Sequence, residues 1–126
     1  MNRFQKLSTA ALVAASFTST ALATNDKLTI GIVTFSTSDV DTNQMVDTMS
    51  QEAKSKGWSV ETLNANGDPS QAITSIKQLA TKKVDAIIVT VFDSTGLAAG
   101  LQAAADAKIP VLSAGGGMAD GIALSA

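Results

Sequence analysis

The chain is 126 residues long and carries nine basic against eleven acidic side chains, with neither cysteine nor histidine. This small acidic excess argues against nucleic acid or an anionic membrane as a partner. The missing cysteine excludes disulfides and thiol chemistry, and the missing histidine removes the commonest metal ligand and general base. No Walker lysine, nucleophile elbow or metal-ligand cluster occurs, so we expect no cofactor, and any catalysis would depend on carboxylates alone.

Residues 1–23 have the three parts of a secretory signal peptide. Two basic side chains give a positive start, an apolar stretch covers residues 7–17, and Ala21-Leu22-Ala23 places small residues at both outer positions. This pattern predicts export and cleavage after Ala23, because the apolar stretch is too short to cross a bilayer as a mature helix. The alternative, a buried first helix, is disfavoured because polar residues interrupt the segment without helical period. We therefore expect a periplasmic protein.

Alternating strand and helix patterns begin after this segment. Residues 28–34 are an almost continuous apolar and β-branched run, which is typical of a strand covered on both faces. A helical pattern follows in which Asp41 or Thr42 can cap the start and Gly57 can supply the left-handed end. Residues 58–63 then alternate between polar and apolar and predict a half-exposed strand.

The same order repeats in the second half of the chain. Asp68 and Pro69 suit the N-cap and first position of a helix that has one apolar stripe. Residues 86–91 predict a buried strand, and Asp93-Ser94-Thr95 opens a third helix. Residues 109–112 predict a fourth strand.

Strands that begin near residues 28, 58, 86 and 110, each separated by a helix-length segment, are typical of right-handed parallel βαβ crossovers. They predict an α/β fold, an open parallel sheet with helices on both faces. After the fourth strand the sequence runs into Gly115-Gly116-Gly117, a flexible turn, and reaches its end without another complete helix. We therefore expect residues 24–126 to be an incomplete N-terminal lobe of about four βα units, with an uncovered last strand that promotes aggregation.

Ligands of open parallel sheets bind beyond the carboxyl ends of the strands. In this chain those segments contain carboxylates and hydroxyls but neither Lys nor Arg. Such a set suits a small, neutral, polyhydroxylated ligand, because an ionised carboxylate accepts strong hydrogen bonds from hydroxyl groups. The candidate ligand-binding residues are Asp93, Asp39, Ser36, Ser38, Asp41 and Ser94.

Several of these residues also have a purely structural interpretation. Asp93 can be a helix N-cap, and the cap and ligand roles can coexist, whereas Asp41 has a sufficient role as a cap. The serines can be ordinary loop residues. Phe35 and Phe92, which flank the loops, can stack on a sugar or pack in the core, and core packing is the favoured alternative.

Five segments share their order and spacing with a known family. They are Leu28-Thr29-Ile30-Gly31-Ile32, Ala53-Lys54-Ser55-Lys56-Gly57-Trp58, Asn66-Gly67-Asp68-Pro69, Asp85 to Ser94, and Ala107-Lys108-Ile109-Pro110-Val111. With them, the chain resembles the type I periplasmic sugar-binding proteins of the ribose-binding kind, which serve ABC importers. The resemblance covers essentially all of residues 27–111.

The resemblance implies two lobes, joined by a hinge, that close on one sugar and present it to a membrane permease without catalysing a reaction. It also implies that Asp93 hydrogen-bonds sugar hydroxyls and that Asp39 lies where a polar first-loop residue does likewise. Two departures argue against ribose itself as the ligand: Val40-Asp41-Thr42 stands where family members carry aromatic residues, and Gly115-Gly116 stands where they often have an Asp-Arg pair. One partial lobe is not expected to clamp a ligand alone.

Two other classes of protein remain as alternatives. A receiver-type signalling domain would use Asp39, Asp41 and Asp93 as an acidic magnesium and phosphoacceptor site, although the export leader and a missing strand-five lysine argue against it. A small exported carboxylate hydrolase would use Asp93 and Asp39 as its acid pair.

Overall fold

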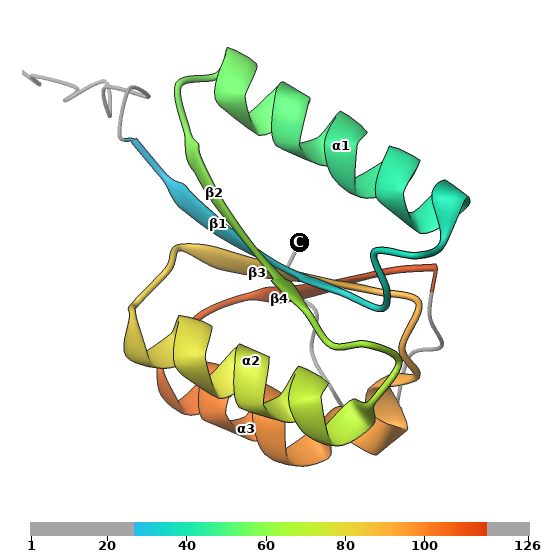
Figure 1. Cartoon of the computed structure of the whole chain (residues 1–126). Coiled ribbons are helices and arrows are strands. Elements are labelled where there is room, and N and C mark those ends of the chain that lie inside the picture. The colour runs from blue at the N-terminus through green and yellow to red at the C-terminus, as the bar shows by residue number, and fades with distance from the viewer. Residues whose placement is uncertain (1–26, 116–126) are drawn as a thin grey trace, which may run out of the picture.

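The computed structural model describes residues 27–115, which form one four-stranded sheet with helices on both faces (Figure 1). The expected signal peptide, residues 1–23, and the segment after Gly115 lie outside the described residues. In chain order the elements are β1 (Thr29–Thr34), α1 (Val40–Ser55), β2 (Ser59–Asn64), α2 (Pro69–Thr81), β3 (Ala86–Thr90), the 3₁₀ turn η1 (Ser94–Leu97), α3 (Ala98–Asp106) and β4 (Val111–Ala114). Within residues 27–115 there is no helix with the length and apolar character needed to span a membrane.

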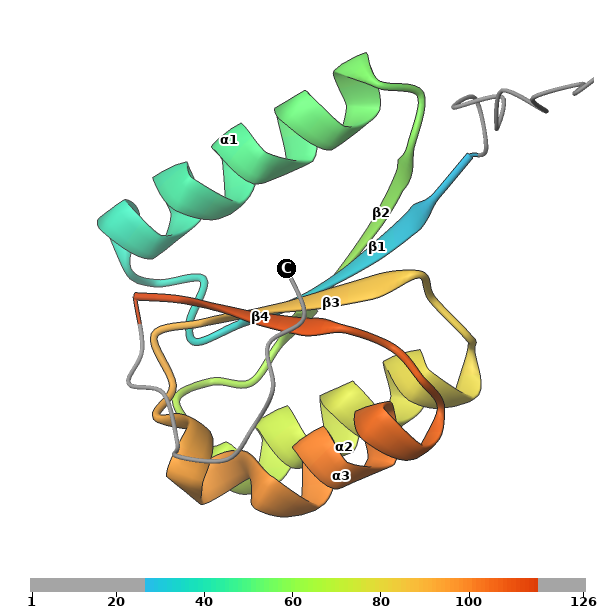
Figure 2. The ribbon, with the colours of Figure 1, turned by 180° about the vertical axis from the view of Figure 1, so that it is seen from behind.

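The sheet has the strand order β2-β1-β3-β4, and every neighbouring pair is parallel. Figures 1 and 2 show α1 on one face and both α2 and α3 on the other. This arrangement confirms the predicted open α/β sheet. Because all strands run in one direction, their carboxyl ends lie at one edge of the sheet. We call the loops at this edge, residues 35–39, 65–68 and 91–93, the carboxyl rim.

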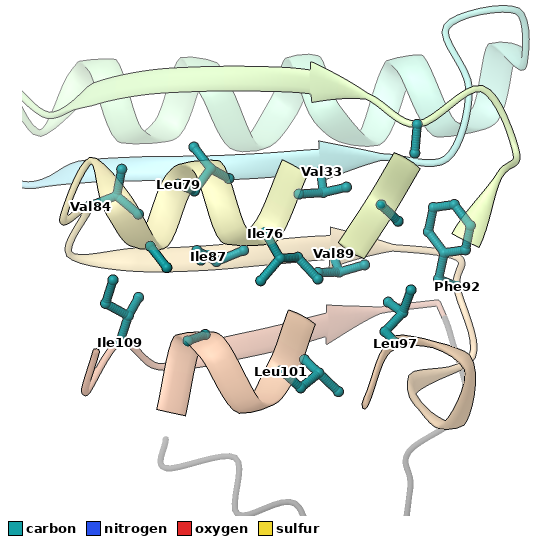
Figure 3. Packing of buried hydrophobic residues seen from close by; sticks show 14 residues of the cluster. Val33, Ile76, Leu79, Val84, Ile87, Val89, Phe92, Leu97, Leu101 and Ile109 are labelled. Atoms are coloured by element: carbon teal, nitrogen blue, oxygen red, sulfur yellow. The ribbon is translucent and has the colours of Figure 1, made fainter. Parts of the chain in front are cut away.

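The larger core lies between the sheet and the pair α2 and α3 (Figure 3). Ile76 and Leu79 of α2 are fully buried there, which is the apolar stripe predicted from the sequence. Gly31 allows α2 to approach β1, because a Cβ at this position would lie 2.6 Å from Cδ1 of Leu79. A smaller cluster around Ile32 and Val46 lies beneath α1 on the opposite face.

The face beneath α1 is only partly covered. A groove of about 550 Å³ extends from Leu28 and Trp58 across Ile88 to Leu112, whose side chain is 45% exposed. β4 is an edge strand among the described residues, since β3 is its only partner there. Within residues 27–115, no helix covers Leu112 of β4, while the segment after Gly115 lies outside the described residues.

Helix ends agree with the sequence except at the starts of α1 and of the third helix. The predicted third helix is divided, because Asp93 caps the short 3₁₀ turn η1 and α3 begins only at Ala98. Asp68 is the N-cap of α2, and Pro69 is the first residue of this helix. Gly57, which follows the end of α1, has a left-handed φ of +79°. The N-cap of α1 is Asp39, whose carboxylate accepts the backbone N–H of Thr42 at 3.0 Å, so the predicted cap at Asp41 or Thr42 is wrong. The helix begins at Val40, two or three residues earlier than a cap at Asp41 or Thr42 would place its start, and Asp41 therefore lies inside its first turn.

The observed strand boundaries differ from the predicted ones by one or two residues. β2 starts at Ser59 rather than Trp58, and β4 covers Val111–Ala114 rather than residues 109–112. Pro110 has no N–H to donate, and β4 pairs with β3 as far as Ala114. The observed β4 therefore lies closer to the carboxyl rim than the predicted strand. Ser113 consequently belongs to the strand and not to a loop.

Candidate ligand-binding site

Hydrogen bonds connect the first two loops of the carboxyl rim. Asn64, at the end of β2, donates from Nδ2 to Oγ1 of Thr37 at 3.0 Å and to Oδ1 of Asn66 at 2.9 Å. The backbone N–H of Gly67 donates to the carbonyl of Phe35 at 2.7 Å. The loops after β1 and β2, far apart in sequence, therefore form one surface.

The third loop is attached to the first loop and to β4. The backbone N–H of Phe35 donates to Oγ1 of Thr90 at 3.0 Å, which links the exit of β1 to the end of β3. The N–H of Val91 donates to the carbonyl of Ala114 at 2.8 Å. The rings of Phe35 and Phe92 lie 4.9 Å apart at 52°, and Phe92 is buried in the main core (Figure 3). These contacts support the predicted packing role of the two rings.

Asp39 and Asp93 occupy equivalent places on neighbouring strand ends. Asp39 follows β1 and caps α1, where its Oδ2 accepts both the backbone N–H and the hydroxyl of Thr42. Asp93 follows β3 and caps η1, where its Oδ1 accepts the backbone N–H of Thr95 at 3.0 Å and its hydroxyl at 2.9 Å. Both side chains are exposed.

Each of these two carboxylates uses one oxygen for its cap and leaves the other available. Within residues 27–115, Oδ1 of Asp39 and Oδ2 of Asp93 accept no protein hydrogen bond. The hydroxyl of Thr42 followed by its N–H lowers the pKa of Asp39, and the N–H of Thr95 followed by its hydroxyl lowers the pKa of Asp93. Both groups are therefore ionised at neutral pH, and each offers a free acceptor oxygen.

The remaining predicted residues have different surroundings. Ser36 is half-buried and its Oγ accepts the backbone N–H of Ser38 at 3.1 Å, a local turn that leaves Ser38 exposed. Asp41 is exposed in the first turn of α1, where its charge is favourable near the positive helix end. Ser94 is half-buried as the first residue of η1. Asp41 and Ser94 thus lie on helical turns that start at the rim.

Two buried threonines, which the sequence interpretation treated only as strand residues, also lie at the rim. Thr34 and Thr90 end the central strands β1 and β3 and are 1% and 0% exposed. Oγ1 of Thr90 accepts a hydrogen bond from the N–H of Phe35, whereas Oγ1 of Thr34 has no hydrogen-bond partner among residues 27–115. The sequence did contain a signal for these two residues, because each threonine is the last residue of its strand and directly follows apolar residues.

The polar side chains of the rim loops are acidic or uncharged. No Lys or Arg lies in residues 35–39, 65–68 or 91–93. In the described part of the chain, no group of three or more acidic side chains is placed so that it could hold a metal ion. Lowered pKa values at Asp39 and Asp93 disfavour a hydrolase, because a general acid needs a raised pKa.

Comparisons with known proteins agree with the fold. The family model of the periplasmic binding protein domain matches residues 30–122. An ABC sugar transporter subunit from Rhodobacter sphaeroides is 27% identical, with a TM-score of 0.64 over 68% of this chain and 30% of that chain. The periplasmic binding protein component of an arabinose ABC transporter from Shewanella, bound to L-arabinofuranose, is 26% identical, with a TM-score of 0.61 over 68% of this chain and 28% of that one.

A third solved structure is an ABC transporter solute-binding protein from Agrobacterium vitis with bound allitol. It is 25% identical, with a TM-score of 0.65 over 75% of this chain and 35% of that chain. No curated protein matches the chain significantly. The chain spans about a third of the length of each solved structure. Because the family model matches most of its residues, the chain belongs to the periplasmic binding protein domain family, as the resemblance implied.

Proposed function

We propose that this chain is the N-terminal part of an exported solute-binding protein that captures an uncharged sugar or polyol and delivers it to an ABC importer. The observation that carries the proposal is that Asp39 and Asp93 each cap a helical turn with one oxygen, while the other oxygen accepts no hydrogen bond within residues 27–115 and lies at the same edge of the sheet. Two ionised acceptors without a nearby cation favour a ligand that donates hydroxyl protons and disfavour an anion.

Similar proteins support the ligand class. The structures from Shewanella and Agrobacterium vitis hold L-arabinofuranose and allitol, which are both uncharged and rich in hydroxyl groups. Export and a periplasmic location are supported by the signal-peptide pattern of residues 1–23 and by the family to which the chain belongs. Delivery to a permease, rather than chemistry, is the role that this family membership favours.

The chain supplies one side of the binding site. Because it spans about a third of the solved structures it matches, the opposing surface would come from a further lobe. A single lobe contacts one face of a sugar and leaves the other in water, so we expect this chain alone to bind with millimolar affinity. Tight binding would need both lobes.

The test is saturation-transfer NMR of the purified chain with L-arabinose, allitol, D-glucose and D-glucose 6-phosphate. We expect at least one neutral compound to bind and the phosphorylated one to bind more weakly than D-glucose. Asp93→Asn and Asp39→Asn should each weaken binding several-fold, because an amide replaces an anionic acceptor. Asp106→Asn is the matched control, since Asp106 ends α3 and hydrogen-bonds Gln102 away from the rim.

Opposite results would reject the proposal. Preference for the phosphorylated sugar, or equal losses in the control and the rim variants, would show that the carboxylates do not select a neutral ligand. Covalent phosphorylation of Asp93 by a small phosphodonor with magnesium would favour the receiver-type alternative instead.

A further inference from the structure

Val91 has a backbone conformation that valine rarely adopts. Its φ is +67°, in the left-handed region that clashes with a β-branched side chain. The N–H of Phe92 donates to the carbonyl of Thr90 at 2.8 Å, so Val91 is the central residue of a γ-turn with positive φ, which is a strained turn. Glycine would adopt this conformation without the clash.

The residues on both sides of Val91 hold this turn in place. Thr90 ends β3, is fully buried, and accepts the N–H of Phe35. Phe92 is 5% exposed and points from the end of β3 into the core (Figure 3). The N–H of Val91 itself is bound to the carbonyl of Ala114. The surrounding structure therefore enforces the strain rather than relaxing it.

The side chain of Val91 is not part of that core. It is 40% exposed and belongs to neither hydrophobic cluster of the described residues. It stands on the carboxyl rim two residues before Asp93, the carboxylate with a free Oδ2. Glycine at this position would stabilise the fold more than an exposed valine does, because it has no strain at a positive φ. A contribution to binding would explain why the side chain is there.

We propose that the isopropyl group of Val91 packs against the C–H surface of the bound sugar or polyol, while the carboxylate of Asp93 accepts a hydrogen bond from a hydroxyl group of the same ligand. The inference rests on the proposed function and deepens it, since it adds an apolar contact to a rim that is otherwise polar. A polyol presents both hydroxyl groups and a C–H surface, so pairing a carboxylate with a small apolar side chain matches both. Backbone strain at Val91 is then the structural cost of this contact.

The test compares Val91→Gly with Lys83→Gly in this chain. Lys83 also has a positive φ, +56°, but it follows α2 at the opposite edge of the sheet. Both substitutions remove left-handed strain and should raise Tm by about 5 °C. Only Val91→Gly should weaken binding of L-arabinose or allitol, by about threefold to tenfold, because only this variant loses an apolar contact.

A second variant separates contact from backbone effects. Asn tolerates a positive φ, so Val91→Asn should keep the turn and still bind more weakly than wild type, whereas Val91→Ile should bind at least as well. Unchanged amide shifts of Thr95 would show that the Asp93 cap is intact in each variant. Wild-type affinity in Val91→Gly, or a lower Tm than wild type, would overturn the inference. Failure of the wild-type chain to bind any neutral polyol would instead reject the proposed function, and the Val91 contact with it.

Discussion

Replacing each buried rim threonine by valine tests how the carboxyl rim is held together. The change is chemically the same at Thr34 and Thr90, which end neighbouring strands and are both almost completely buried. Thr90→Val removes the acceptor for the half-buried N–H of Phe35, and an unsatisfied buried donor costs about 1–3 kcal/mol. Thr34→Val removes a hydroxyl that has no hydrogen-bond partner in the described part of the chain, so it should be neutral or stabilise by up to about 1 kcal/mol.

The two variants should therefore differ in free energy of unfolding by about 1–4 kcal/mol, with Thr90→Val less stable than wild type and Thr34→Val at least as stable as wild type. Urea unfolding followed by circular dichroism measures this difference. With an m-value of about 1 kcal/mol/M, Thr90→Val should lower the midpoint by roughly 1–3 M while Thr34→Val leaves it unchanged or raises it. Equal losses in both variants would refute the reasoning, because they would show that the hydroxyls do not differ in their hydrogen bonding.

Three further predictions concern packing, pH and association. Gly31→Ala should destabilise the fold by about 1–3 kcal/mol in the same urea assay, since the new Cβ would meet Leu79 at 2.6 Å; an unchanged midpoint would contradict this close approach. Hydrogen bonds lower the pKa of Asp39 and Asp93 below 3.8, so their stabilisation is complete above that value and is lost as pH falls through the lowered pKa values. Carboxyl ¹³C titration should give both midpoints below 3.8, and a midpoint at or above 3.8 would exclude the caps. Leu112→Lys should reduce concentration-dependent association in sedimentation velocity without lowering Tm, whereas unchanged association would show that the face beneath α1 is not responsible.

The fold could be predicted from the sequence because its signals are local. Period and length distinguished strands from helices, and Asp68 with Pro69 marked the start of α2. The cap of α1 was misplaced because Asp39, Asp41 and Thr42 are all good capping residues within four positions. Which of them caps depends on where the helix meets the sheet, and that is a tertiary property.

The gathering of the rim loops could also be predicted, since parallel strands place their carboxyl ends at one edge. Its finer features could not. Residues 86–91 looked like one strand, but the chain turns at Val91 because Phe92 is buried and β4 holds the N–H of Val91. No glycine marked this turn. Similarly, only the cap geometry shows which oxygen of Asp39 or Asp93 remains free.

Amide chemical-shift mapping of the chain during titration with allitol shows whether the carboxyl rim binds the ligand. We expect shifts in residues 35–39 and 91–93 of the carboxyl rim and in the helical turns that follow them, with little change in residues 56–58, 83–85 and 108–110 at the opposite edge. Shifts concentrated at the opposite edge or in the groove beneath α1, with a silent rim, would contradict binding at the rim.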